Sequence, residues 1–190
     1  MTVTSEGLAA LRDAPGARYS AVQIALHWLV VLLIAEQYVT SAAILRTHAY
    51  RPLGKGPDPF DMTLHTVHTR VGLAIFALVV LRLVFRLARG TPSWRSLLPL
   101  WRTRLSSAVQ YALYLVLLAE AAAGAIASYL WWPMSVVHQA LFWTLLALVA
   151  LHLGGAVLSF AARPRETLYR IAGIFAPSTP RRSSNLGEAR

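Results

Sequence analysis

The stretch from Leu105 to Ala162 contains no lysine or arginine over 58 residues and only one acidic residue, Glu120. An α-helix needs about 20 apolar residues to cross a bilayer, so this stretch is long enough for two crossings. Residues 131–133, with the sequence Trp-Trp-Pro, divide it. Aromatic residues beside a proline are typical of a turn at a membrane interface. The stretch therefore predicts two membrane-spanning helices, at about 106–130 and 134–162.

Two further apolar segments precede this stretch. The first, at about 21–45, contains a single charged residue, Glu36. The second, at about 63–88, must include Arg70 and Arg82, because the 11 residues between them are too few to cross a bilayer. Long arginine side chains near the ends of a span can extend to the interface. The sequence therefore predicts an all-α integral membrane protein, a four-helix bundle.

The composition agrees with this class. Only 14% of the residues are charged, whereas an average soluble domain has about 25%. The net charge of +10 does not indicate a nucleic-acid partner, because the basic residues flank apolar segments and form no polar basic face. The absence of cysteine excludes iron–sulfur clusters and thiol catalysis.

The basic residues lie mostly on one side of the predicted bundle. The N-terminal segment, the connection between the second and third spans with its flanks, and the C-terminal tail hold 14 of the 18 lysines and arginines. The positive-inside rule therefore places both termini in the cytoplasm. Residues 1–17 are expected to be a polar N-terminal segment, 18–173 the transmembrane domain, and 174–190 a disordered cytoplasmic tail.

Histidines fall within these predicted spans, where ionisable side chains are costly and usually functional. His138 and His152 lie 14 residues apart, about 40° short of four helical turns, so both leave one face of the fourth span about 21 Å apart. The topology places His27 at the depth of His152, on the inner side, and His68 at the depth of His138, on the outer side. His48 is expected to be a solvated loop residue.

Two histidines that face each other from separate helices suit the axial ligation of a haem, whereas zinc would need further ligands. Gly72 follows His68 by four residues, and Gly155 follows His152 by three. The missing side chains there would leave room for a flat macrocycle. Close helix packing is the alternative explanation for both glycines. His65 is a rival ligand on roughly the same helix face as His68. His68 is favoured because it has the glycine at the right offset and lies deeper.

Several short motifs accompany these histidines: Arg18-Tyr19-Ser20, Leu26-His27-Trp28-Leu29, His68 with Gly72, Arg82-Leu83, Tyr114 with Gly124, His138, and Leu151-His152. With them the chain resembles the bacterial cytochrome b561 family, four-helix di-haem proteins of the inner membrane, from about residue 18 to 173. The resemblance implies two b haems. It implies that His27 and His152 are the axial iron ligands of the inner haem, and His68 and His138 those of the outer haem.

Iron with two histidine ligands has no open coordination site, which favours outer-sphere electron transfer over oxygen binding. The resemblance implies transmembrane electron transfer and exchange of electrons with quinone, and in some members oxidation of superoxide. The protein would then be a quinone-linked oxidoreductase. The alternative is a membrane subunit that anchors a soluble redox protein and accepts its electrons. Lipid and quinone are the expected partners, and superoxide or a redox protein is a further candidate. Whether the chain forms a homodimer is left open.

Three charged residues are further candidates. Arg70, two residues from His68, could pair with a propionate of the outer haem, or could anchor the helix at the interface. Glu36 and Glu120 lie at similar depths, where a bare carboxylate is costly, so each is expected to be protonated, paired or water-exposed. They are candidate catalytic residues, as proton acceptors in quinol oxidation. The alternative is a hydrogen bond that packs two helices.

Overall fold

The structure is a computed structural model that describes residues 19–49, 56–89 and 99–162. These residues form four α-helices: α2 (Ala21–Ala49), α3 (Pro59–Arg89), α4 (Leu100–Tyr129) and α5 (Met134–Ala162). Each helix is long and apolar enough to cross a membrane. The prediction of an all-α, four-helix membrane protein is confirmed. The expected N-terminal segment and C-terminal tail lie outside the described residues.

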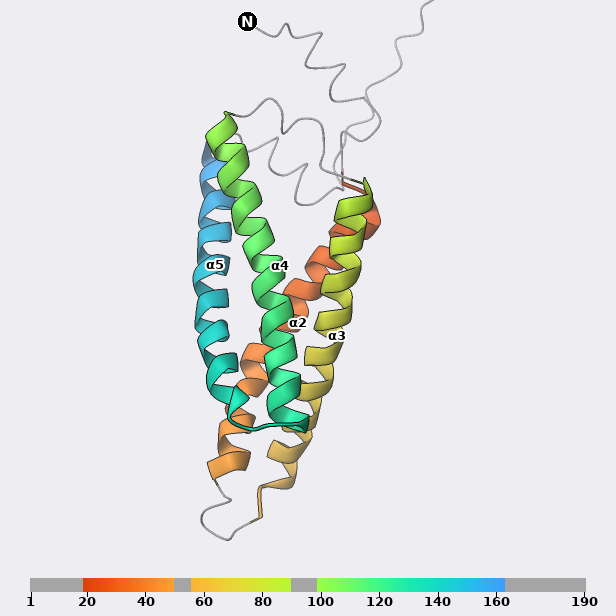
Figure 1. The fold of residues 1–190 in the computed structure, drawn as a ribbon, viewed down its shortest axis with the longest axis vertical. Coiled ribbons are helices and arrows are strands. Elements are labelled where there is room, and N and C mark those ends of the chain that lie inside the picture. Colours follow the sequence, from red (N-terminus) through yellow and green to blue (C-terminus); the bar gives the residue numbers. More distant parts are fainter. Residues whose placement is uncertain (1–18, 50–55, 90–98, 163–190) are drawn as a thin grey trace, which may run out of the picture.

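The four helices pack as two antiparallel pairs. Helix α2 packs on α3 and α4 packs on α5, while a smaller contact between α3 and α4 joins the two pairs (Figure 1). Within the described ranges, α5 makes no comparable contact with α2 or α3. The α4–α5 turn lies at the same end of the bundle as the end of α2 and the start of α3 (Figure 1). We call this end the turn end and the opposite one the far end.

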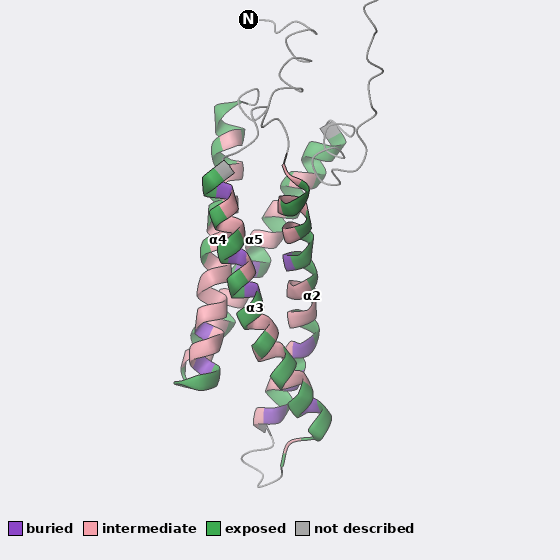
Figure 2. Cartoon of the chain, turned by 90° about the vertical axis from the view of Figure 1, so that its right-hand side faces the viewer, coloured by how far each residue is buried: buried purple, intermediate pink, exposed green. Residues whose placement is uncertain are grey.

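Few side chains are buried in this bundle. Val30, Ile75 and Val79 form the core cluster, where α2 meets α3. Large apolar side chains cover the outside instead, for example Leu32 at 66% and Val39 at 74% exposure, and exposed residues line the outer faces of the helices (Figure 2). Exposed apolar surface on this scale marks a protein in contact with a membrane, because lipid tails cover the apolar side chains that would be unfavourably exposed to water. The chain is therefore a multi-pass membrane protein.

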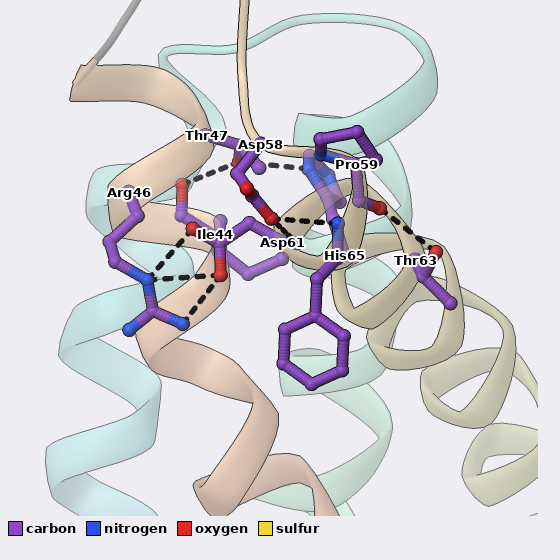
Figure 3. A network of polar contacts seen from close by, with 9 residues as sticks. Ile44, Arg46, Thr47, Asp58, Pro59, Asp61, Thr63 and His65 are labelled. Carbon is purple, nitrogen blue, oxygen red and sulfur yellow. Dashed lines mark hydrogen bonds and ion pairs between the residues drawn. The ribbon is translucent and has the colours of Figure 1, made fainter.

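Polar contacts hold α2 and α3 in register at the turn end. The guanidinium of Arg46 donates to the carboxylate of Asp61, with Nε–Oδ2 at 2.9 Å and Nη2–Oδ1 at 2.6 Å (Figure 3). Asp58 caps α3 by accepting the backbone N–H of Phe60 at 2.8 Å. Pro59 is then the first helical residue, a position that proline favours. Helix α3 therefore begins four residues earlier than the apolar segment predicted.

Helices α2 and α4 also extend beyond one end of their predicted spans, whereas α5 has the predicted bounds. Helix α2 continues to Ala49, and α4 begins at Leu100, directly after Pro99. The predicted helix ends were those of the apolar segments, whose length reflects the thickness of the bilayer core. A helix can continue past that thickness into polar residues, because its backbone hydrogen bonds are made within the segment.

Candidate functional site

Four histidines form two pairs, each between two different helices. The ring centroids of His27 (α2) and His152 (α5) are 6.4 Å apart, with an interplanar angle of 75°. Those of His68 (α3) and His138 (α5) are 6.5 Å apart, at 89°. We call these the far-end pair and the turn-end pair. The structure thus brings together the histidines that the sequence grouped by depth, and α5 contributes one ring to each pair.

The distance within each pair fits two axial ligands of one metal ion. An imidazole nitrogen binds a first-row metal at about 2.0 Å and its ring centroid lies roughly 1.2 Å behind it, so two collinear ligands hold their centroids about 6.4 Å apart. Each pair also joins two helices that make few backbone contacts with one another in the described residues. The described residues contain no cluster of three or more His, Cys, Asp or Glu, as a structural zinc site would need. The residues therefore fit a macrocycle that supplies the equatorial ligands itself.

The ring of His138 is held by α4. Its Nδ1 lies 3.0 Å from the backbone carbonyl oxygen of Glu120 and 3.3 Å from Oε1 of the same residue. A carbonyl only accepts, so Nδ1 carries the proton and donates, which leaves Nε2 available to a metal. Gly124, one turn after Glu120, permits this approach, because a Cβ there would lie 3.0 Å from Cε1 of His138.

Arg82 contacts the far-end pair. Its Nη1 donates to Nδ1 of His27 at 2.7 Å, and its guanidinium lies over the ring of Tyr114, 5.9 Å from the centroid. Arg82 therefore contacts residues of the neighbouring helices α2 and α4. An ionisable residue inside a span is usually functional, a signal that the sequence interpretation did not use for Arg82. A histidine that binds metal through Nε2 keeps its proton on Nδ1, so Arg82 needs another acceptor when the site is filled.

The two glycines near the histidines differ in their surroundings. A Cβ at Gly72 would lie 3.7 Å from Oε1 of Gln37, so this glycine faces α2 and the explanation by helix packing applies to it. Gln37 in turn donates through Nε2 to the backbone carbonyl of His68 at 2.9 Å. A Cβ at Gly155 would meet no atom within 4 Å, which is consistent with room beside His152.

The two candidate carboxyls lie near the turn-end pair but are not bonded to each other within the described residues. Oε2 of Glu36 accepts a hydrogen bond from Gln37 at 3.0 Å, and Glu120 lies beside His138. The other oxygen of each, Oε1 of Glu36 and Oε2 of Glu120, is buried without a hydrogen-bond partner in the described part of the chain. Arg70 is exposed, and it leaves α3 about 200° around the axis from His68.

His48 and His65 lie beyond the turn-end pair. The prediction that His48 is a solvated loop residue is wrong: it lies in the last turn of α2, with its ring centroid 3.8 Å from that of Trp132 and 5.6 Å from that of His65. Both histidines line a cavity of about 270 Å³, which residues 127–132 complete. His65 therefore faces the turn-end cavity, whereas His68 lies opposite His138.

The fold and the site define a multi-pass helical membrane protein with two pairs of histidines between its helices. The sequence matches the model of the family described as prokaryotic cytochrome b561 over residues 18–173, and the chain belongs to this family. It is similar to cytochrome b561 homolog 1 of Escherichia coli (strain K12), with 28% identity over 102 residues, 54% of each chain. The match spans about half the length of this curated relative. No solved structure matches the chain.

Proposed function

We propose that the protein carries electrons across the bacterial inner membrane through two b haems and exchanges them with the quinone pool. The observation that carries this proposal is the separation of the ring centroids, 6.4 Å in the far-end pair and 6.5 Å in the turn-end pair. In this arrangement His27 and His152 ligate the far-end haem, and His68 and His138 ligate the turn-end haem. Both termini lie in the cytoplasm, and the turn end faces the opposite side.

A bound b haem supplies reversible one-electron chemistry, and two imidazole ligands leave its iron without an open position for oxygen. The chain supplies orientation, apolar surroundings and local charge. The two histidines of α5 lie about 21 Å apart along the helix, so the two sites lead from one face of the membrane towards the other. Arg82 is the residue suited to donate to a propionate of the far-end haem. Arg70 leaves the face of α3 opposite to His68, which favours the alternative role of an anchor at the interface.

Exchange with quinone also involves protons, since oxidation of a quinol to a quinone releases two electrons and two protons. Glu36 and Glu120 support this chemistry, because each holds a buried carboxyl oxygen that has no hydrogen-bond partner among the described residues and lies close to the turn-end pair. Residues 130–133 alone connect α4 to α5 and offer little surface for a dedicated soluble subunit. This favours a diffusible quinone as the exchange partner.

The proposal is tested by a pyridine haemochrome assay on the purified protein. We expect two b haems per chain and a low-spin, six-coordinate spectrum. A high-spin species that binds carbon monoxide would contradict ligation by two histidines. Reduction by quinol and by superoxide, followed in the haem absorbance, then tests the two candidate electron donors.

Histidine substitutions assign the sites. His27→Ala and His152→Ala should each remove the far-end haem and leave one haem per chain. His68→Ala and His138→Ala should each remove the turn-end haem. His65→Ala is the matched control and should retain both haems; if it loses a haem and His68→Ala does not, the assignment on α3 is wrong.

A further inference from the structure

The hydroxyl of Thr40 lies between the ring of His68 and the backbone of its own helix. Its Oγ1 is 3.0 Å from Nδ1 of His68 and 3.0 Å from the carbonyl oxygen of Glu36. The carbonyl can only accept, so the single hydroxyl proton is donated to it. Towards His68 the hydroxyl oxygen therefore accepts, and Nδ1 of His68 carries the proton. Thr40 is 4% exposed, so bulk water does not compete for this bond.

We propose that Thr40 is a positioning residue for the turn-end haem, a proposal that rests on the function proposed above. Thr40 holds His68 in the tautomer with the proton on Nδ1, and it orients the ring so that Nε2 is free to bind iron opposite His138. A hydrogen bond from Nδ1–H also raises the basicity of a metal-binding imidazole. A more basic axial ligand stabilises ferric over ferrous iron and so lowers the reduction potential of that haem.

The contact between Thr40 and His68 is supported on both sides by other contacts between α2 and α3. One turn towards the far end, Nε2 of Gln37 donates to the backbone carbonyl of His68 at 2.9 Å. At the turn end, the ion pair between Arg46 and Asp61 holds the two helices in register. The position of the hydroxyl relative to the ring is therefore set by helix packing, as a positioning role requires.

The chain repeats this geometry at a second threonine and histidine. Oγ1 of Thr47 lies 3.1 Å from Nδ1 of His65 and donates to the carbonyl of Ile44 at 2.9 Å. Thr47 is 3% exposed, so the two threonines are equally buried. The difference is that His65 lines the turn-end cavity, whereas His68 faces His138. Thr47 is therefore a matched control for the role of Thr40.

The experiment compares Thr40→Val, Thr40→Ser and Thr47→Val in the purified, haem-loaded protein, by haem content and by redox titration of both haems. Valine keeps the shape of threonine and removes the hydroxyl, and serine restores it. A neutral hydrogen bond changes an equilibrium about fivefold, which corresponds to about 40 mV for a one-electron couple. We expect Thr40→Val to raise the potential of one haem by about this amount or to release that haem. Thr40→Ser should restore the wild-type value, and Thr47→Val should leave both potentials unchanged.

The outcomes separate this proposal from the proposed function. Wild-type protein without two b haems would overturn the function itself. Two haems with unchanged potentials in Thr40→Val would overturn the role of Thr40 alone. A shift in Thr47→Val but not in Thr40→Val would transfer the positioning role to Thr47 and the ligand role to His65. The far-end haem reports on folding, because a folded Thr40→Val variant retains it even if the turn-end haem is lost.

Discussion

Gly124→Ala tests the turn-end site through a single added methyl group. A Cβ at this position would lie 3.0 Å from Cε1 and 3.2 Å from Nδ1 of His138, whereas ordinary contact begins at 3.4 Å. The ring must therefore withdraw by about 0.4 Å. Its hydrogen bond to the carbonyl of Glu120, 3.0 Å in the structure, would then approach the limit of a useful bond. The loss of this bond costs about 1 kcal/mol, and loss of a ligand's supporting contact typically weakens metal binding about 10- to 100-fold.

The expected result is a chain that retains the far-end haem and binds the turn-end haem weakly, measured as haem per chain after purification. Alanine is the better helix former by about 1 kcal/mol, so without the steric conflict the variant would be more stable than the wild type. Gly154→Ala is the matched control, because a Cβ there meets no atom within 4 Å, and it should retain both haems. Two haems, an unchanged spectrum and a raised melting temperature in Gly124→Ala would refute the reasoning.

Two further predictions concern charged groups near the haem sites. Arg82→Gln removes a positive charge that contacts His27, so the far-end haem should become harder to reduce, and Arg82→Lys should recover part of the potential in a redox titration. A far-end potential that does not move in Arg82→Gln would place the guanidinium away from the filled site. Glu36→Gln and Glu120→Gln should retain both haems but slow haem reduction by quinol and change its pH dependence. Unchanged rates and pH profiles in both variants would leave these carboxyls a packing role only.

The sequence alone determined the class of the fold and the depth of the histidines. Bilayer thickness sets the length of a span, and an apolar stretch without lysine or arginine, such as residues 105–162, admits few other structures. Once four spans are placed, the position of a histidine along its span determines which other histidines share its depth. The helix ends were predicted less well, because capping at Asp58 and Pro59 continues α3 beyond its apolar segment.

The tertiary structure decided what each imidazole nitrogen contacts. Thr40 beside His68 and Arg82 beside His27 join residues from α2 and α3, and no spacing within either helix predicts them. The physical reason is that a helix surrounded by lipid is apolar on most of its faces, so its hydrophobic pattern does not determine its rotation about its own axis. That rotation depends on a few polar contacts between neighbouring helices, such as Arg46 with Asp61, and these exist only after the helices have packed.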